Sequence, residues 1–428
     1  MELQAVLLLA HVVASASAAV EKFSSIAVDT EHVLGLTSEH SFGCVGMDWW
    51  PSSKCDYGSC PWGNASILNA DLNNSMLQNA LKELSPIYLR LGGSLSDFVR
   101  YEDGKTNCRP FSDPTNSTRL GYEIGSGCLT MKRWDELNTF CSKTQCSLLF
   151  DVGALFGRQN TSCPAQTDCH HTPVPCCTNW TGSWDPGNAE SLLRYTKEKG
   201  YQIAGFEFGN ELVANGGIEA HLTTDQYVHD FCMLKDLVSK IWSEEGEHRP
   251  KLITPDNAFE KKWYGEFLLK AIEAGCPPDI ITWHQYLLGA GKDPNVGSRA
   301  LDPNVLNQQI LDGQNVQTTI IANSKGLPSP PEIWMGEAGG AYNSGRHLVT
   351  DAFHSSFWYL DGFGILSEKG HQTFCRQTLV GGNYGLLNTT TYEPNPDYYG
   401  LLLWQKLMGR EVFHVNIHTT KEVSTPGT

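Results

Sequence analysis

The feature that most constrains the fold of this chain is a regular alternation of short apolar runs with helix-like segments. Each run is too short for a helix and is apolar almost throughout, as strands buried on both faces are. The predicted strands are residues 42–47, 87–91, 147–152, 205–208, 251–254, 280–283, 332–335 and 374–380. The segments with helical periodicity are residues 72–84, 134–141, 189–199, 224–243, 263–274, 304–323 and 347–368.

Repeated strand–helix alternation predicts a parallel α/β fold. Eight units over roughly 360 residues suit a closed (β/α)8 TIM barrel better than an open sheet. A doubly wound sheet is the alternative, but no Gly-x-Gly-x-x-Gly motif follows the first predicted strand. We therefore expect a barrel over residues 41–400.

The N-terminus resembles an export signal. An apolar run from Ala5 to Ala14 precedes Ala16-Ser17-Ala18, which fits an A-x-A cleavage site, although Glu2 stands where such signals carry positive charge. A short buried helix is the alternative. Six N-x-S/T acceptors support export, and they predict glycosylation at Asn64, Asn73, Asn116, Asn160, Asn179 and Asn388. We expect residues 1–19 to be a signal peptide of a glycoprotein that is secreted, to the cell wall for example, or sent to a lysosome or vacuole.

Fourteen cysteines in an exported chain indicate mostly disulfides. Eight of them fall in pairs close in sequence: Cys55/Cys60, Cys141/Cys146, Cys163/Cys169 and Cys176/Cys177. The stretch from Cys163 to Cys177 contains His170-His171 and could bind zinc, but disulfides in a loop are the simpler interpretation. Cys44 lies inside an apolar run and is interpreted as a buried thiol.

The charge of the chain disfavours several partners. With 31 basic and 47 acidic residues and a net charge of −16, it repels nucleic acid and anionic membranes unless it keeps a local basic patch, and no long Lys/Arg run exists. No apolar run after the N-terminus reaches the roughly 18 residues of a membrane span, which leaves peripheral membrane association open. We expect no cofactor and no metal.

Polar groups gather where the predicted strands end, and the chemistry of barrel enzymes lies at these ends. Any one of these groups could be a strand-end cap. The residues are Asp48, Arg90, Gly93, Ser94, Asp151, Asn210, Glu211, Asp256, Asn257, His284, Gln285, Tyr286, Glu337, Asn383 and Tyr384.

Two carboxylates at strand ends stand out. Glu211 and Glu337 follow the fourth and seventh predicted strands, so they lie on one ring of strand ends. A helix cap or a salt-bridge partner would explain either residue alone, but the pair favours glycoside cleavage. We predict Glu211 as proton donor and general acid/base, and Glu337 as nucleophile. Carboxyl groups about 5–5.5 Å apart would support a retaining mechanism, whereas 6.5–9.5 Å would indicate inversion.

Neighbouring polar residues fit this chemistry. Asn210 could hydrogen-bond the 2-hydroxyl of the sugar. Tyr286 and His284 could orient Glu337 and hold it ionised, although a lone histidine is more often a satisfied core residue.

Five motifs resemble the heparanase-like glycosidases, glycoside hydrolase family 79, in particular its plant branch. They are ELSPIYLRLGG at residues 83–93, FGNE at 208–211, TWHQY at 282–286, GEAGGAY at 336–342 and GNY at 382–384. The resemblance implies a retaining β-glucuronidase with Glu211 as proton donor and Glu337 as nucleophile. It implies uronate recognition by the loop Asn343-Ser344-Gly345, which stands where heparanase proper carries glycines, and by Tyr384. It also implies that Asp48 contacts sugar hydroxyls. Gly93, Ser94 and Tyr342, which lie in or beside these motifs, complete the expected substrate-binding set.

The resemblance also implies a β-sandwich built from an N-terminal strand and a longer C-terminal region. We expect residues 20–40 to supply that strand and residues 401–428 to begin a C-terminal β-domain that is cut short, leaving a remnant with an exposed edge at residues 23–29.

The net charge argues against a long sulfated substrate, so we expect exo-removal of glucuronic acid from glycoprotein glycans or small glucuronides. The alternatives are a catalytically silent carbohydrate-binding protein, a heparanase-type endo-β-glucuronidase, another barrel glycosidase such as an arabinofuranosidase, and a metal enzyme.

Overall fold

The structure is a computed structural model that describes residues 22–105, 108–109, 111, 125–162, 178–213, 216–244, 246 and 248–420. The chain divides into two compact units. The larger unit is Leu36–Arg410, and the smaller combines the chain up to Gly35 with the chain from Glu411 onward. The predicted signal peptide, Asn116 and the stretch from Cys163 to Cys177 lie outside the described residues.

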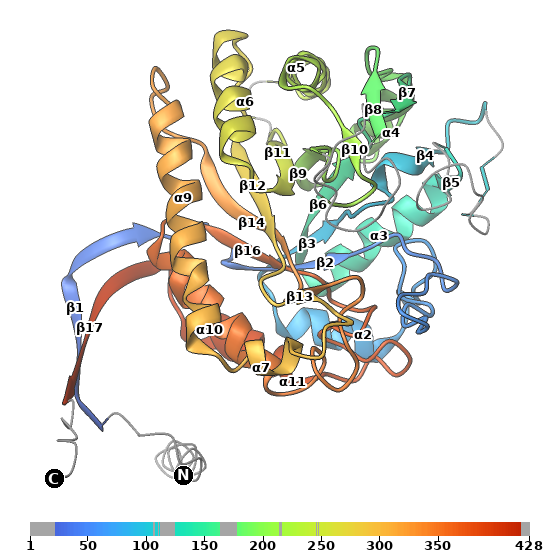
Figure 1. The fold of residues 1–428 in the computed structure, drawn as a ribbon. Coiled ribbons are helices and arrows are strands. Elements are labelled where there is room, and N and C mark those ends of the chain that lie inside the picture. Colours follow the sequence, from blue (N-terminus) through green and yellow to red (C-terminus); the bar gives the residue numbers. More distant parts are fainter. Residues whose placement is uncertain are drawn as a thin grey trace, which may run out of the picture. The chain divides into compact units, whose positions relative to one another are not determined.

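Eight parallel strands of the larger unit close into a barrel in chain order. Figure 1 shows these strands at the centre of the unit with helices around them. The strands are β2 (Gly43–Met47), β3 (Ile87–Leu91), β6 (Cys146–Val152), β9 (Ile203–Phe208), β11 (Lys251–Ala258), β12 (Ile280–Gln285), β14 (Glu332–Ala338) and β16 (Thr373–Arg376). The predicted (β/α)8 barrel is confirmed, and the doubly wound alternative is wrong because the first and last strands pair with each other.

The helices around the barrel are α2 (Ser75–Glu83), α3 (Met131–Thr144), α4 (Gly187–Glu198), α5 (Thr224–Ile241), α6 (Lys261–Glu273), α7 (Val296–Arg299), α8 (Pro303–Leu306), α9 (Gln308–Asn323), α10 (Ser355–Glu368) and α11 (Pro396–Leu407). Side-chain oxygens of Asn74, Thr130 and Thr223 cap α2, α3 and α5, as their positions before each helix favour. The predicted boundary at residue 400 falls inside α11.

Three expected elements differ from the structure. The helix predicted over 304–323 is interrupted at Asn307, which ends α8 and precedes α9. The helix predicted from residue 347 begins only at Ser355: Leu348 has a left-handed backbone (φ 60°), and residues 349–354 form turns. The strand predicted over 374–380 ends at Arg376, after which the Leu379 N–H and the Thr378 hydroxyl donate to the carbonyl of Gly46.

Short strands decorate the barrel. The pairs are β4 (Val99–Tyr101) with β5 (Gly127–Leu129) and β13 (Gly289–Ala290) with β15 (Ala341–Tyr342). β7 (Gln159–Ser162), β8 (Thr178–Thr181) and β10 (Ala220–His221) form a three-stranded sheet. In the smaller unit, β1 (Lys22–Leu36) pairs with β17 (Glu411–Thr420). None of the helices in the described ranges combines the length and apolar composition that a membrane span requires.

The barrel interior changes from apolar to charged along the strands. Its N-terminal part is filled by one apolar cluster: Cys44, Tyr88, Leu149, Ile253, Ile280, Trp334 and Cys375. Side chains that face the same way recur every second residue along a strand, so Arg90 follows Tyr88, Asp151 follows Leu149, and Thr282 follows Ile280 into the next layer. All three are almost fully buried. The strands therefore deliver charged groups into the barrel directly below its C-terminal end.

All ten cysteines in the described part of the chain form disulfides: Cys44–Cys375, Cys55–Cys60, Cys108–Cys128, Cys141–Cys146 and Cys232–Cys276. The interpretation of Cys44 as a buried thiol was wrong. Cys44 and Cys375 are register partners on β2 and β16, so their bond joins the first and last strands where the barrel closes.

Because Cys44–Cys375 closes the barrel, removing it should lower the free energy of unfolding more than removing a disulfide between residues close in sequence. Because a disulfide constrains the unfolded chain more when it closes a longer loop, Cys44→Ala/Cys375→Ala should cost about 5 kcal/mol of unfolding free energy, and Cys141→Ala/Cys146→Ala about 2 kcal/mol. The sequence separations are 331 and 5 residues. Thermal midpoints of the two double variants under non-reducing conditions measure the difference. Equal losses would contradict it.

Candidate active site

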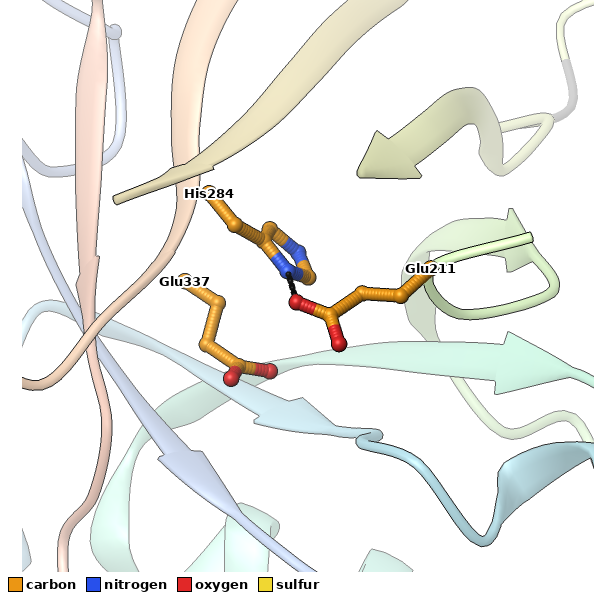
Figure 2. Close-up of side chains that lie close together, drawn as sticks. All are labelled: Glu211, His284 and Glu337. Carbon is orange, nitrogen blue, oxygen red and sulfur yellow. Dashed lines mark hydrogen bonds and ion pairs between the residues drawn. The ribbon is translucent and has the colours of Figure 1, made fainter. Parts of the chain in front are cut away.

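Glu211 and Glu337 meet at the C-terminal end of the barrel. Glu211 directly follows Gly209 and Asn210 after β9, and Glu337 lies near the end of β14. One carboxylate oxygen of each, together with a ring nitrogen of His284, lie within 4.8 Å of one another. Figure 2 shows the two carboxyl groups turned toward each other from different elements, with His284 beside Glu211.

The backbone around Glu211 fixes the position of its side chain. Glu211 has a left-handed backbone (φ 56°), which is uncommon for a residue with a side chain and often marks functional sites. Its N–H donates to the carbonyl of Asp256, at 2.9 Å. A β-carbon at Gly217 would lie 2.8 Å from Glu211 Oε2, so only glycine leaves that oxygen room. The turn and the glycine together determine where the carboxyl group points.

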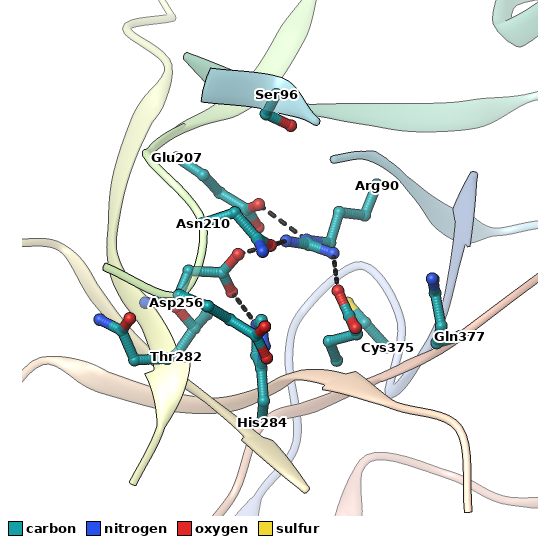
Figure 3. A network of polar contacts seen from close by, with 12 residues as sticks. Arg90, Ser96, Glu207, Asn210, Asp256, Thr282, His284, Cys375 and Gln377 are labelled. Atoms are coloured by element: carbon teal, nitrogen blue, oxygen red, sulfur yellow. Dashed lines mark hydrogen bonds and ion pairs between the residues drawn. The ribbon is translucent and has the colours of Figure 1, made fainter. Parts of the chain in front are cut away.

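Arg90 is the central cation of the site. From β3, its Nε donates to Glu207 at 2.8 Å, its Nη1 to Glu337 at 2.8 Å, and its Nη2 to Asn210 at 2.9 Å and to Asp256. Figure 3 shows Glu207, Asn210 and Asp256 gathered around the guanidinium. With 1% of its surface exposed, Arg90 exchanges water entirely for these partners.

Burial and Arg90 set the charges of the surrounding acids. Burial would raise the pKa of Asp256, but Arg90 and His284 outweigh it and hold that pKa at about 2. Burial raises the pKa of Glu207 to about 7 despite Arg90. Burial also raises the pKa of Glu211, against the contact with His284. The site therefore holds carboxyl groups with very different proton affinities, which acid–base catalysis requires.

Tyr286 and His284 contact different carboxylates. The Tyr286 hydroxyl donates to Glu337 Oε1, as we expected of it. His284, expected to orient Glu337, instead lies 2.9 Å from Glu211 Oε1 through Nδ1 and 2.8 Å from Asp256 Oδ1 through Nε2. Glu337 thus receives one donor on each oxygen, from Tyr286 and from Arg90.

The predicted sugar-binding residues Asn210 and Asp48 are held by neighbours. Asn210 Oδ1 accepts from Arg90, which leaves its Nδ2 as the group available for a sugar hydroxyl. Asp48 accepts from Gln377 at 2.9 Å, and burial together with Glu337 raises its pKa to about 7. A β-carbon at Gly93 would lie 2.5 Å from Asp48, so this glycine permits the close approach. Ser94 is half-buried in the same turn.

The predicted uronate loop has an unusual backbone. Asn343, Ser344 and Gly345 have φ of 55°, 63° and 68°, all left-handed. Such angles cost a residue with a side chain roughly 1–2 kcal/mol, so Asn343 and Ser344 hold a conformation that glycine would adopt at lower cost.

Residues of a second loop hydrogen-bond to the loop Asn343-Ser344-Gly345. The Asn343 amide donates to the Tyr57 hydroxyl, the Ser344 hydroxyl to Asp56, and the Trp62 indole to Ser344. Tyr384 packs edge-on to Trp62, and Tyr342 packs edge-on to Tyr286.

Several polar groups of this site were not predicted to have a role: Arg90, Glu207, Asp256, Gln377 and Asp151. Arg90 and Glu207 stand inside apolar strands, and a buried charge needs an opposite charge. That rule gives the sequence signal for their pairing. Both oxygens of Asp151 are buried without a hydrogen-bond partner, and burial together with Asp97 and Glu207 raises its pKa well above the ordinary range. We therefore treat Asp151 as a neutral acid.

Two clusters have the composition of metal sites: Glu211, His284 and Glu337, and below them Asp151, Glu207 and Asp256. In the first cluster, the atoms that would bind an ion already have other partners. His284 contacts Glu211, and Glu337 accepts hydrogen bonds from Arg90 and Tyr286. In the second, Arg90 contacts Glu207 and Asp256. These contacts favour a hydrogen-bonded acid–base site over an ion site.

The predicted N-glycosylation sites that fall within the described residues lie at or near the surface. Asn64, Asn73, Asn160 and Asn388 are exposed, and Asn179 is half-buried with its oxygen 3.0 Å from His221.

The profile of glycosyl hydrolase family 79, N-terminal domain, matches residues 23–364. The chain is 42% identical over 409 residues to heparanase-like protein 3 of Arabidopsis thaliana, covering 95% of this chain and 71% of that relative. It is 37% identical over 392 residues to baicalin-β-D-glucuronidase of Scutellaria baicalensis, covering 90% and 71%. Among solved structures, a family 51 arabinofuranosidase from Xanthomonas axonopodis matches with a TM-score of 0.62 at 12% identity, over 94% of this chain and 80% of that one. The last match shows the barrel fold alone.

The raised pKa values of the buried acids predict that the free energy of unfolding falls as pH rises. Burial is the main cause that raises the pKa of Asp48 and Glu207 to about 7 and of Asp97 to about 6. These groups bind protons more tightly in the folded state, so their contribution is complete below their ordinary values near 4 and is lost as pH rises through 6 to 7. We expect the thermal midpoint at pH 5 to exceed that at pH 8 by about 4 °C or more. A higher midpoint at pH 8 would contradict this account.

Two carboxyl-to-amide variants test the charge assignment. Asp256→Asn removes an ionised partner of Arg90 and should cost about 3 kcal/mol of unfolding free energy. Asp151→Asn replaces a neutral acid by a neutral amide and should cost less than about 1 kcal/mol. Thermal midpoints at pH 5.5 compare them, and equal destabilisation would show that Asp151 is ionised.

Proposed function

Because the chain belongs to glycosyl hydrolase family 79, we propose that it is a retaining β-glucuronidase that removes terminal glucuronic acid from glycans or small glucuronides. The observation that carries this proposal is the pair Glu211 and Glu337, with carboxylate oxygens within 4.8 Å of each other at the barrel mouth. This separation supports direct attack by one carboxylate, because an inverting pair must leave room for a water between the groups.

The surroundings of the two residues support different roles. Glu337 receives hydrogen bonds from Arg90 and Tyr286 on separate oxygens, which stabilise its charge and aim it as nucleophile. Glu211 is the acid: burial raises its pKa, which favours the protonated form before reaction. Glu211 protonates the glycosidic oxygen while Glu337 attacks the anomeric carbon and forms a glycosyl ester. Glu211, now ionised, then deprotonates the water that displaces Glu337.

The uronate carboxylate fits the loop Asn343-Ser344-Gly345 and Tyr384. Backbone N–H groups of a turn can bind a carboxylate, and the left-handed φ of all three residues bends the chain here. The acidic neighbour Asp56 is compensated by Lys54, whose ammonium lies 3.0 Å away. The relatives named for glucuronidase activity support this assignment.

Exo-action is supported by charge and by one loop. A net charge of −16 does not favour a long sulfated polyanion. The loop closed by Cys55–Cys60 contacts Asn343 and Ser344 through Tyr57 and Asp56, so it occupies space beside the proposed uronate pocket. A substrate that extends past the uronate on this side would meet that loop.

We also propose that the protein travels the secretory route to the cell exterior or to a lysosome or vacuole. The five disulfides of the described residues and the exposed Asn-x-Ser/Thr sites support this route, together with the signal-like N-terminus.

Substrate and variants test the function together. The wild-type protein should hydrolyse p-nitrophenyl β-D-glucuronide at acidic pH in preference to sized heparan sulfate fragments and to p-nitrophenyl α-L-arabinofuranoside. Glu337→Gln and Glu211→Gln should each lower kcat by about 10²–10⁴-fold, because each removes one half of the acid–nucleophile pair. Glu332→Gln is the matched control: it lies on the same strand at the opposite end of the barrel and should keep activity.

Other outcomes exclude particular parts of the proposal. Cleavage of heparan fragments alone would show endo-action, and arabinofuranoside cleavage alone would show another glycosidase. Absence of turnover on every sugar would favour a silent binding protein, and loss of activity with a chelator would favour a metal enzyme.

A further inference from the structure

The contacts of His284 carry an inference about the proposed acid. We infer that His284 stays a doubly protonated imidazolium that occupies one oxygen of Glu211 and reserves the other for the leaving group. The inference rests on the proposed function, because the proton on Nδ1 is assigned from the role of Glu211 as acid, whereas the proton on Nε2 is assigned from Asp256 alone. His284 would act through Glu211, and it is therefore a positioning residue.

The first step concerns the Asp256 side of the ring. Asp256 Oδ2 accepts from Arg90, and Oδ1 lies 2.8 Å from His284 Nε2 (Figure 3). A carboxylate paired with a guanidinium is ionised and can only accept hydrogen bonds. His284 Nε2 therefore carries a proton.

The second step concerns the Glu211 side. His284 Nδ1 lies 2.9 Å from Glu211 Oε1 (Figure 2), while Oε2 lies on the side of Gly216 and Gly217. A proton on Oε1 would be held in the bond to Nδ1 and could not reach a substrate. An acid that serves a leaving group must carry its proton on Oε2, and Oε1 is then an acceptor. Nδ1 must therefore donate, so both ring nitrogens carry protons.

The charges around the ring agree with this state. The groups facing His284 are Asp256 on β11, Glu211 after β9, and Glu337 on β14; Arg90 on β3 is the second cation, beyond Asp256. Burial disfavours the charge on His284, but Asp256 and Glu337 outweigh it and raise its pKa well above the ordinary range.

His371 is an internal contrast. It is equally buried, but the Trp283 indole donates to its Nε2, so that nitrogen has no proton. Burial lowers the pKa of His371 to about 4. Of the two buried histidines in the described residues, His284 is therefore expected to be charged and His371 to be neutral.

The imidazolium keeps both protons through the reaction. Glu211 Oε2 gives its proton to the glycosidic oxygen as the bond from that oxygen to the anomeric carbon breaks. The resulting Glu211 carboxylate retains the hydrogen bond from Nδ1–H. In the second half, this carboxylate takes a proton from the attacking water, which restores the starting state. A neutral histidine would instead turn a lone pair toward the new carboxylate.

Nuclear magnetic resonance of the full chain with ¹⁵N-histidine tests the inference without substrate. From pH 5 to 8, both nitrogens of His284 should show imidazolium shifts, and His371 should remain neutral. His284→Asn and His371→Asn assign the two signals. In Asp256→Asn, His284 should lose its charge within this range. A wild-type His284 that is neutral at pH 7 overturns the inference, even if the glucuronidase activity is found.

Kinetics supply the second readout. His284→Asn keeps an N–H donor near the position of Nδ1 but removes the charge. Because that charge favours the ionised form of Glu211, its loss should raise the pKa of Glu211 and move the basic limb of the kcat/KM–pH bell to higher pH. A fall in rate without movement of the bell would show a merely structural role and overturn the inference. If no glucuronide is cleaved, the proposed function fails and the resonance measurement still decides this point.

Discussion

The site depends on one buried cation, Arg90. Its guanidinium joins β3 to Glu207 on β9, to Asp256 on β11 and to Glu337 on β14, and it also fixes the amide of Asn210. A guanidinium suits this place because its planar fork presents several donors in fixed directions and stays charged when buried. Without it, several carboxyl groups would face each other in a medium that screens charge poorly, and protons would neutralise them.

The barrel supplies the geometry for this network. Inward-facing side chains recur every second residue, so an apolar layer around Cys44 and Trp334 is followed by the charged layer that contains Arg90. Buried ion networks contribute little to stability, because desolvation costs about as much as the attraction returns. The large apolar core around the barrel provides the stability, and the charged layer places Glu211 and Glu337 with different proton affinities within reach of one sugar.

Much of this arrangement could be predicted from periodicity. Apolar runs predicted all eight barrel strands with their ends within about four residues, and strand order then placed Glu211 and Glu337 on one ring. That Arg90 needs an acidic partner could be predicted, but which acids it contacts and which carboxylate His284 contacts could not, because contacts between strands depend on register and on a bulge between Thr254 and Asn257. The Cys44–Cys375 disulfide was not predicted either, because only barrel closure brings residues so distant in sequence together. The helix predicted from residue 347 shows the limit of helical periodicity, since Leu348 is left-handed and turns continue to residue 354 before α10 begins.

The central claim is that Glu337, held by Arg90 and Tyr286, forms a covalent bond to the sugar while Glu211 acts as acid and base. The most direct measurement is to incubate the protein with a 2-deoxy-2-fluoro-β-glucuronyl fluoride and to locate the adduct by peptide mass spectrometry. The account predicts one fluoroglucuronyl group per chain, attached to Glu337 and absent in Glu337→Gln. A label on another carboxylate, or turnover of glucuronides with inversion at the anomeric carbon and no adduct, would contradict it.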